Sequence, residues 1–288
     1  MIHFVIVSYC SWKELKPLVE QVQMSGLQDF TLHVWDNLGD ANIREGVKEV
    51  ANTIYYKSKN VGYGNGFNNV ISQITLAEND LFFVCNDDVV LNQKTIGEML
   101  KAFEDLKRNA NKTGVISPRF LTDVGVEQTM FYDNLIKSEN GFWKTDFTPA
   151  ALWLVDYSFF KEVGGFLPDF FMYGEDKELC FRARNLGFQN FVAARATVNH
   201  EFKYPPSNFK IWVETERNHI AAHFLNLNKP KVSATGFVIS GLATSIYRFD
   251  IRRFGAIILG MVGFFGMFSK FRKLRKSLQK RTEFRFLK

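Results

Sequence analysis

Two adjacent acidic residues, Asp87 and Asp88, follow an apolar run, LFFVC over residues 81–85. Such a run is typical of a buried parallel strand, and open α/β sheets bind their ligands at the carboxyl ends of such strands. Neighbouring carboxylates are costly to remove from water unless a cation or a hydrogen-bond donor is close. Hard oxygen ligands suit Mg²⁺ or Mn²⁺. Taken alone, the segment is equally compatible with a strand that ends in a solvated acidic turn.

Other polar residues stand at the ends of predicted strands or at the start of a predicted helix. They are Asp36-Asn37, the glycine-containing segment 60–68, His200, and Glu175-Asp176 before a helix. In a doubly wound sheet these positions converge on one rim although they are distant in the chain. Three of them also have a plainer explanation: acids at a helix start complement the macrodipole, the glycines fit a tight turn, and His200 fits a lone surface or core histidine. The glycine spacing is neither GxGxxG nor a P-loop, so dinucleotide or ATP-type phosphate binding is not supported.

Strands and helices alternate through the first 120 residues. Apolar, β-rich runs occupy 3–9, 30–35, 53–56, 81–85 and 114–120, with helix-compatible segments between several of them. This alternation predicts an α/β fold with a parallel, doubly wound sheet. An irregular stretch at 121–148 is followed by an apolar run at 150–155, helices at 157–163 and 177–186, and a last strand at 191–198. No low-complexity linker interrupts the chain, so residues 1–228 form one predicted domain and residues 229–288 a separate helical region.

Composition indicates a folded chain, because 46% of the 288 residues are hydrophobic and 23% are charged. The net charge of +6 is concentrated at one end: the last nineteen residues carry nine Lys or Arg against Glu283, a charge of +8, which leaves −2 on the rest. Three cysteines, Cys10, Cys85 and Cys180, form no CxxC pair and indicate structural thiols in a reducing, cytosolic compartment. The amino terminus shows no secretory signal pattern.

The carboxyl-terminal region indicates contact with a membrane. Residues 232–247 and 254–269 are uncharged runs, shorter than the about 20 residues that a spanning helix needs. The second run, followed by the basic tail, is typical of an interfacial helix on an anionic membrane. A helix packed on the core with a solvated tail, and a re-entrant hairpin of the two runs, are the alternatives. The basic tail alone would also fit nucleic acid, but its apolar neighbour and the acidic remainder favour lipid.

Taken in order, these motifs resemble family 2 glycosyltransferases of the GT-A fold, specifically the bacterial rhamnosyl- and galactofuranosyltransferase-like branch. The resemblance covers about residues 1–225. The matching segments are Val7-Ser8-Tyr9, Asp36-Asn37, 60–68, the DxD-like Asn86-Asp87-Asp88-Val89, 163–166, 170–176, 179–182, Gly187, His200 and Arg217-Asn218. Two positions depart from the family pattern: Asn86-Asp87-Asp88 replaces Asp-x-Asp, and Lys177-Glu178 replaces the more usual valine-aspartate. The first departure leaves metal coordination dependent on Asp88.

The resemblance implies a metal-dependent, inverting transfer of a sugar from a nucleotide diphosphate donor to a hydroxyl acceptor. It implies that Asp88 and His200 bind Mn²⁺ or Mg²⁺, which acts as a Lewis acid on the leaving diphosphate. Asp176 is the expected base and Glu175 orients it, or the two exchange roles. The residues expected to line the nucleotide pocket are Ser8, Tyr9, Asp36, Asn37, Asn60, Gly62, Asn68, Asn86 and Asp87. Trp143 and Trp153 are candidates for stacking on acceptor sugar rings, with core packing the alternative for Trp153.

The expected donor is dTDP-rhamnose or UDP-galactofuranose, and the expected acceptor is a saccharide or a lipid-linked saccharide in the synthesis of a bacterial surface polysaccharide such as O antigen. The expected location is cytoplasmic, peripheral on the inner face of the cell membrane. One rival, a sugar-phosphate nucleotidyltransferase, lacks support because no glycine-rich loop bearing Lys or Arg follows the first strand. Another rival, a non-catalytic membrane-docked module, is disfavoured because Asp88 and Asp176 are both present.

Overall fold

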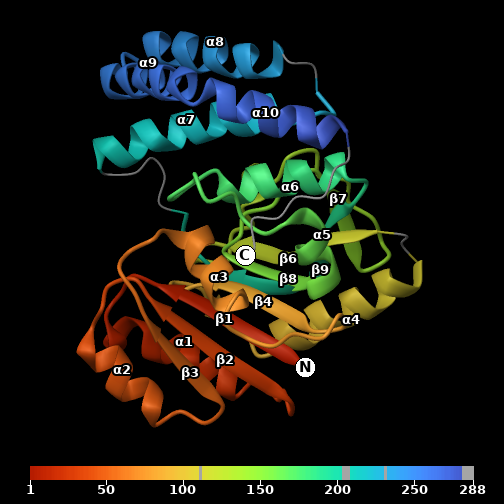
Figure 1. The fold of residues 1–288 in the computed structure, drawn as a ribbon. Helices are drawn as coiled ribbons and strands as arrows, with labels where there is room; N and C mark the ends of the chain where they lie inside the picture. Colours follow the sequence, from red (N-terminus) through yellow and green to blue (C-terminus); the bar gives the residue numbers. More distant parts are fainter. Residues whose placement is uncertain (110–111, 203–207, 230–231, 281–288) are drawn as a thin grey trace.

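The structure, a computed structural model, describes residues 1–109, 112–202, 208–229 and 232–280. Within these residues one nine-stranded sheet has the order β3-β2-β1-β4-β8-β6-β9-β5, and β7 pairs with β9 outside this path (Figure 1). The strands are β1 (Ile2–Ser8), β2 (Phe30–Asp36), β3 (Thr53–Lys57), β4 (Leu81–Asn86), β5 (Val90–Leu91), β6 (Thr113–Leu121), β7 (Phe142–Thr145), β8 (Leu152–Asp156) and β9 (Gln189–Asn199). The helices are α1 (Trp12–Gln23), α2 (Ala41–Lys48), α3 (Tyr63–Ile71), α4 (Thr95–Asn109), α5 (Tyr157–Val163), α6 (Glu175–Asn185), α7 (Phe209–Leu225), α8 (Val232–Tyr247), α9 (Ile251–Gly266) and α10 (Phe268–Gln279).

The sheet is parallel in its first half and mixed beyond it. β1 pairs in parallel with β2 and β4, and β2 pairs in parallel with β3. The carboxyl ends of these four strands therefore share one edge, as the alternation of strands and helices predicts. β8 is antiparallel to both β4 and β6, whereas β6 and β9 are parallel. The predicted α/β fold class is confirmed, and the insertion of β8 makes the sheet mixed beyond β4.

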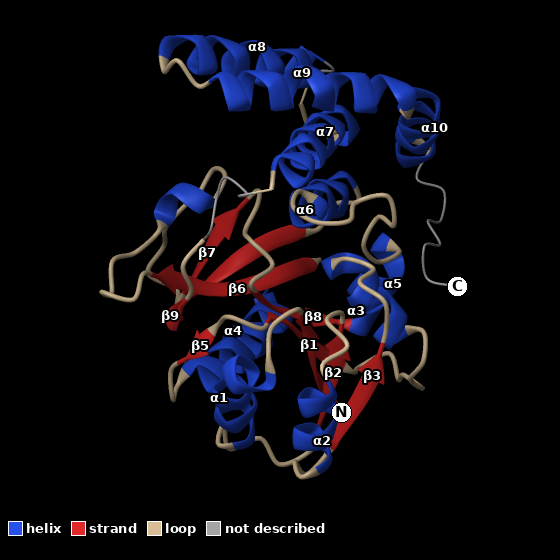
Figure 2. Ribbon diagram, turned by 90° about the vertical axis from the view of Figure 1, so that its left-hand side faces the viewer, coloured by secondary structure: helices blue, strands red, loops and turns tan. Residues whose placement is uncertain are grey.

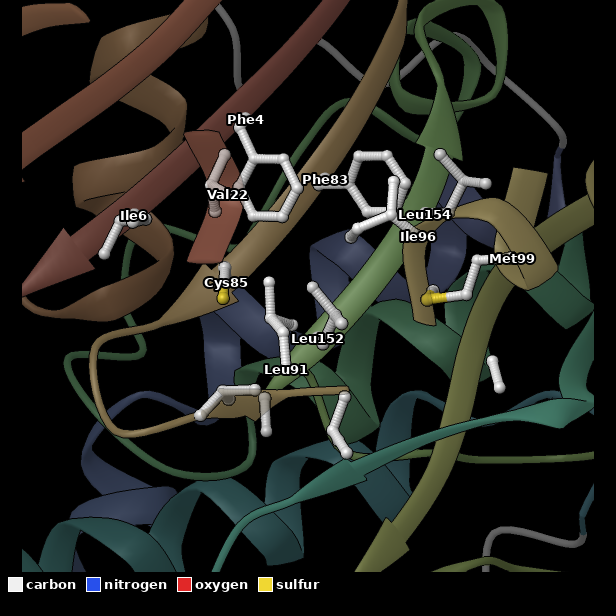
Figure 3. Packing of buried hydrophobic residues seen from close by; sticks show 14 of the residues in the cluster. Phe4, Ile6, Val22, Phe83, Cys85, Leu91, Ile96, Met99, Leu152 and Leu154 are labelled. Carbon is white, nitrogen blue, oxygen red and sulfur yellow. The ribbon is translucent and has the colours of Figure 1, made fainter. Parts of the chain in front are cut away.

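Alternating side chains of the central strands face two separate cores. On one face, Phe4, Ile6 and Phe83 pack with helices α1 and α4 (Figure 3). On the other face, Val5 and Val7 pack with α3, α5 and α6. Because β1 and β4 are buried on both faces, they occur in the sequence as continuous apolar runs rather than as alternating ones.

Helices α7 to α10 form a further layer on the side of α6 (Figures 1 and 2). α9 packs closely on α7, since a Cβ at Gly260 would lie 2.9 Å from the backbone nitrogen of Arg217. α10 is held by buried Arg275, whose guanidinium donates to the carbonyls of Phe224 and Asn226 at the end of α7. α7 lies in the predicted 1–228 domain and α9 in the predicted 229–288 region, so the two predicted units share this helical layer.

Among the described residues, no single helix combines the length and the apolar content needed to cross a membrane. α9 and α10 meet these criteria only as a pair, and the pair is bent by 69° at the break between them.

Candidate active site

A cavity of about 490 Å³ lies where the carboxyl ends of β1 and β4 meet the amino terminus of α6. Ligand pockets commonly enclose about 300–1,000 Å³, so the cavity suits a small-molecule site. It collects both predicted acid pairs from distant parts of the chain. The predicted site residues that line it are Tyr9, Asn37, Asn60, Gly62, Asn86, Asp87, Asp88, Glu175, Asp176 and His200.

Asp88 and His200 form the first chemical unit of the cavity. Antiparallel pairing of β5 with β9 places Val90 opposite Asn199 and so brings the turn after β4 beside the end of β9. As a result, Oδ1 of Asp88 lies 3.0 Å from Nε2 of His200. The His200 side chain is 5% exposed and the Asp88 side chain 43% exposed, so a packed imidazole supports an accessible carboxylate.

The donor atoms of this pair fit a hard divalent cation that keeps open positions. Carboxylate oxygen and imidazole nitrogen both ligate Mn²⁺, and the carboxylate suits Mg²⁺. Among the residues that the structure describes, no group of three or more His, Cys, Asp or Glu side chains is arranged to hold a metal ion. Mg²⁺ is commonly bound by one or two carboxylates together with substrate phosphates and water. A pair of protein ligands therefore fits a cation that binds together with a diphosphate.

Asp87 has a structural role, unlike its neighbour Asp88. Its Oδ2 accepts a hydrogen bond of 2.6 Å from the Tyr9 backbone N–H, which ties the end of β4 to the end of β1. Burial raises the pKa of the Asp87 carboxyl, and the Tyr9 N–H opposes this rise. Asp87 therefore holds the wall of the cavity together, while Asp88 presents the accessible carboxylate.

Glu175 and Asp176 open α6 and form the second chemical unit. Gly174 precedes them with a φ of +88°, and a Cβ there would meet a side-chain atom of α7 at 3.0 Å, so this helix start requires glycine. The Asp176 carboxylate accepts hydrogen bonds from the backbone N–H groups of Lys177, at 2.7 Å, and Ala150, at 3.3 Å. Glu175 is 5% exposed, and its Oε2 is buried with no hydrogen-bond partner among the described residues.

The two carboxyls of this second unit differ in how readily they ionise. Burial raises the pKa of both, and the negative charge of Asp176 raises the pKa of Glu175 further. The backbone N–H groups of Lys177 and Ala150, and the Lys177 ammonium, oppose the rise in the pKa of Asp176. A proton shared by the pair therefore resides more readily on Glu175 than on Asp176. An ionised carboxylate in a cavity can accept a proton from a bound hydroxyl.

Tyr173 and Tyr63 also line the cavity. The pKa of the Tyr173 hydroxyl is raised first by burial and then by the negative charges of Glu175 and Asp88. Tyr63, in the first turn of α3, donates from its hydroxyl to the Ala150 carbonyl at 2.6 Å. Its neighbour Gly62 has a φ of +86° and touches the segment that leads into α6, where a Cβ would collide with a backbone carbonyl. The segment around Gly62 and the segment that leads into α6 form two walls of the cavity, and these walls are thus in direct contact.

The sequence pattern described as glycosyl transferase family 2 matches residues 3–164, which is more than half of the chain. The chain belongs to glycosyl transferase family 2. The matched span includes Asp88, whereas the Glu175-Asp176 pair, His200 and the helical layer lie beyond it.

Similar proteins agree with this assignment of a family 2 glycosyltransferase. The low-salt glycan biosynthesis hexosyltransferase Agl10 of Haloferax volcanii is 24% identical over 261 residues, covering 82% of this chain and 81% of that protein. The rhamnosyltransferase WbbL of Escherichia coli is 22% identical over 254 residues, covering 81% of this chain and 94% of that protein. The mannosyltransferase PcManGT from Pyrobaculum calidifontis, solved with GDP-Man and Mn²⁺, has a TM-score of 0.61 at 9% identity, covering 92% of this chain and 86% of that one. This last likeness supports the GT-A fold.

Three residues expected to line the nucleotide pocket of this glycosyltransferase lie behind the cavity wall. Asp36 is fully buried, and its carboxylate accepts from two backbone N–H groups of the following turn and from the Tyr55 hydroxyl. Asn68 clamps the backbone of Phe166 with both polar atoms of its amide. Ser8 is fully buried at the end of β1. In this structure these side chains hold the wall, and the nucleotide contacts expected of them stay a prediction.

Trp143 and Trp153, expected to stack on acceptor sugars, do not line the cavity. Trp153 is 1% exposed in the core, with its ring stacked on that of Phe166, so core packing is the right alternative. Trp143 lies in β7, 9% exposed, with the Lys137 ammonium over its ring. The strand positions that carry both tryptophans face the core and not the cavity, so the structure favours core packing, and the acceptor role stays a prediction.

Several cavity residues of this glycosyltransferase escape the sequence predictions. They are Tyr63, Asp133, Lys177, His219 and Arg253. Lys177 stands out in the sequence only as a departure from the family pattern. His219 and Arg253 come from α7 and α9, and no motif marks them, because their place in the cavity depends on how the helical layer packs on α6.

Proposed function

We propose that this glycosyltransferase moves a sugar from a nucleoside diphosphate donor to a hydroxyl of an acceptor, with inversion at the anomeric carbon. The observation that carries the proposal is the placement of two differently built acid pairs in the wall of one cavity. Asp88 with His200 offers ligands for a cation, and Asp176 offers a carboxyl group that backbone N–H groups hold in place. Inversion needs a proton acceptor on the face opposite the leaving group, which is the role proposed for Asp176.

In this proposal Asp88 and His200 hold Mn²⁺ or Mg²⁺ beside the donor diphosphate. When bound, the cation supplies Lewis-acid stabilisation of the negative charge that develops on the leaving diphosphate. Asp176 accepts the proton of the attacking hydroxyl, and the N–H groups of Ala150 and Lys177 hold its carboxylate in place. Glu175, which burial keeps protonated, places no second negative charge beside the base.

Rhamnose on dTDP and galactofuranose on UDP are the proposed donor sugars. Support comes from the two relatives named above, one a rhamnosyltransferase and the other a hexosyltransferase of glycan biosynthesis. The proposed acceptor is a saccharide or a lipid-linked saccharide. The proposed process is the synthesis of a bacterial surface polysaccharide such as O antigen.

A panel of nucleotide sugars tests this proposal. The full chain is incubated with Mn²⁺ and each of several dTDP-, UDP- and GDP-sugars, and release of the nucleoside diphosphate is measured. We expect Mn²⁺-dependent release from at least one donor, lost in Asp88→Asn. Asp123→Asn is the matched control, because it removes an exposed carboxylate outside the cavity.

Two results would favour the rival functions, one from a parallel assay with nucleoside triphosphates and sugar phosphates and one from the panel itself. Pyrophosphate formed from a nucleoside triphosphate and a sugar phosphate, without release from any nucleotide sugar, would identify a sugar-phosphate nucleotidyltransferase. Binding of a nucleotide sugar without turnover under any condition would favour a non-catalytic binding module.

We also propose that the helical layer binds the inner face of the cell membrane, which would place the enzyme as a peripheral protein on the cytoplasmic side. Large apolar side chains on and between α8 and α9 face solvent, and a surface of this kind marks a site of interaction. Those that are more than 60% exposed are Ile239, Ile246, Tyr247, Phe249, Ile251, Val262 and Phe265. We name this set the apolar surface.

Basic side chains beside the apolar surface point to anionic lipid as the partner. The exposed basic residues on α10 are Lys270, Arg272, Lys273 and Lys276, and exposed Lys280 follows the helix. Lys270 and Arg275 are engaged within the protein, with the Asp169 carboxylate at 2.7 Å and with α7 carbonyls, respectively. The rest of the predicted basic tail, Arg281, Arg285 and Lys288 with Glu283, lies outside the described residues. Apolar insertion and attraction of basic residues together provide stable membrane attachment.

Sedimentation with vesicles tests the membrane proposal. We expect the protein to sediment with phosphatidylglycerol vesicles, and Val262→Glu with Phe265→Glu to abolish this. Val124→Glu is the matched control, because Val124 is an equally apolar, 85% exposed residue outside the helical layer. Substitution is preferable to deletion of 251–288, since α9 packs on α7 and lines the cavity. Undiminished sedimentation of the double variant would show that the apolar surface does not make the lipid contact.

A further inference from the structure

The first turn of α9 contributes a cation to the active-site cavity. Arg253 lines this cavity together with His219 of α7 and Phe237 of α8. Its backbone N–H donates to the Asp250 carboxylate at 2.9 Å, a cap that fixes the start of α9. The carboxyl-terminal helices therefore form one wall of the site, although they lie outside the span that matches the family pattern.

The guanidinium of Arg253 has no partner in the part of the chain that the structure describes. Its Nε is buried without a hydrogen bond, and no described acidic side chain forms an ion pair with it. A partly buried charge without a partner is costly, and an anion that accepts hydrogen bonds from it removes the cost. Arginine suits phosphate in particular, because its planar fork donates two parallel hydrogen bonds to the phosphate oxygens.

The neighbouring charged groups do not neutralise Arg253. Lys177 lies 3.4 Å from the Asp133 carboxylate, so this acid already has a counter-charge. Burial first, and then the positive charges around it, Lys177 and Arg253 among them, lower the pKa of His219 to about 3. The imidazole therefore stays neutral, and the charged side chains that lower its pKa, Lys177 and Arg253 among them, are positive. This end of the cavity is suited to an anion.

Arg253 also links the cavity to the apolar surface. It shares α9 with the exposed Ile251, Val262 and Phe265, and it shares the cavity with Asp176. Phe237, which lines the same cavity, belongs to α8, the other helix that carries the apolar surface. A ligand that fits this arrangement places a sugar hydroxyl at Asp176, an anionic group at Arg253 and an apolar chain along the apolar surface.

We propose that Arg253 binds the phosphate or diphosphate of a lipid-linked saccharide acceptor, whose sugar reaches Asp176 and whose lipid leaves along α8 and α9. This inference rests on the proposed function and narrows its acceptor to the lipid-linked class. It makes Arg253 a specificity-determining residue that the carboxyl-terminal helices supply to the active site.

The test uses farnesyl diphosphate, farnesol and inorganic pyrophosphate as probes, with EDTA present so that no cation at Asp88 captures the diphosphate. Calorimetry on the full chain should show farnesyl diphosphate binding about tenfold or more tightly than either other probe, because only it joins an anion to an apolar chain. Arg253→Gln should lose about tenfold in affinity for farnesyl diphosphate, the effect of one or two charge-assisted hydrogen bonds. Its affinity for farnesol should not change.

Two further variants sharpen the test. Arg252→Gln removes the same charge from the adjacent, exposed position and should keep wild-type affinity. Arg253→Lys keeps the charge without the planar fork and should lose less affinity than Arg253→Gln, even if the glutamine variant folds poorly. Thermal unfolding of each variant shows whether it is folded.

Three results would overturn the proposal. Equal affinities of Arg253→Gln and Arg252→Gln for farnesyl diphosphate would remove Arg253 from the site. Pyrophosphate binding as tightly as farnesyl diphosphate would mean that the ligand is a free anion. A matching loss of Mn²⁺-dependent UDP or dTDP binding in Arg253→Gln would assign Arg253 to the donor. Donor release tests the proposed function without any acceptor, so the two proposals can fail separately.

Discussion

Two pairs of adjacent acids face the same cavity in opposite physical settings. Asp87-Asp88 follows a strand, and Asp88 is 43% exposed beside the His200 imidazole. Glu175-Asp176 opens a helix, and Glu175 is 5% exposed with no hydrogen-bond partner for its Oε2 among the described residues. The first setting is open to a cation and a diphosphate, whereas burial in the second raises the pKa values and favours a shared proton. The burial of each acid pair, rather than its residue types, separates cation binding from proton transfer in this site.

The largest effect is expected from the second pair. Asp176→Asn keeps the shape of the side chain and removes its capacity to accept a proton, so sugar transfer should fall about 10³-fold, within the range of general-base contributions. Donor binding should survive. Initial rates of transfer measure the effect, with Asp123→Asn as the control that loses a carboxylate outside the cavity. Turnover close to that of the wild type would remove Asp176 from the role of base.

Substitution in the first pair should cause a smaller loss of sugar transfer, and this loss should depend on the metal. Asp88→Asn, or excess EDTA, should lower transfer about a hundredfold or more, since a bound metal supplies several kcal/mol of charge stabilisation. Titration of activity against Mn²⁺ should show that Asp88→Asn needs a higher concentration than the wild type. Full activity in excess EDTA would exclude a metal at Asp88 and His200.

Disruption of the contact at Gly62 between the two walls of the cavity should have a smaller effect than substitution of Asp176 or Asp88. Gly62→Ala adds a Cβ that collides with a backbone carbonyl of the segment entering α6, in addition to the strain of a positive φ. We expect a loss of about 2–3 kcal/mol in the free energy of unfolding. Gly26→Ala is the matched control, since Gly26 has a φ of +79° with open space around it. Equal losses in urea denaturation would show that Gly62 does not hold the walls together.

The smallest effect is a pH dependence of stability at Glu175. Its pKa is raised in the folded state, so its neutral form stabilises the fold at low pH, and this stabilisation is lost as the pH rises through the raised pKa. Glu175→Gln stays neutral and should therefore gain thermal stability relative to the wild type as the pH rises from 4.5 to about 8. A difference in Tm that stays constant over this range would show that Glu175 titrates normally.

Sequence reasoning located side chains that stand directly at element ends. Asp88 and His200 follow strands, and Glu175-Asp176 opens a helix. Asp88 lies at the edge shared by parallel β1, β2 and β4, and antiparallel pairing of β5 with β9 brings His200 beside it. The α/β fold class follows from the same alternation of strands and helices.

The same reasoning could not separate cavity residues from wall residues. Asp36 and Asn68 also stand near element ends, but local hydrogen bonds, visible only in three dimensions, occupy their polar atoms. Trp153 lies on β8, and the antiparallel insertion of this strand beside β4 sets the direction in which its side chains face. Arg253 lines the cavity from α9, which packs closely on α7 at Gly260, a contact between helices that no local pattern encodes.

The claim that Asp88 serves a cation and Asp176 a proton is tested most directly by calorimetric titration of UDP and dTDP. The titration is carried out on the wild type, Asp88→Asn and Asp176→Asn, each with Mn²⁺ and with EDTA. We predict that Asp176→Asn keeps the wild-type affinity in Mn²⁺, whereas Asp88→Asn binds the nucleotide equally weakly with Mn²⁺ and with EDTA. Mn²⁺-dependent binding that survives in Asp88→Asn, or that disappears in Asp176→Asn, would contradict this division of roles.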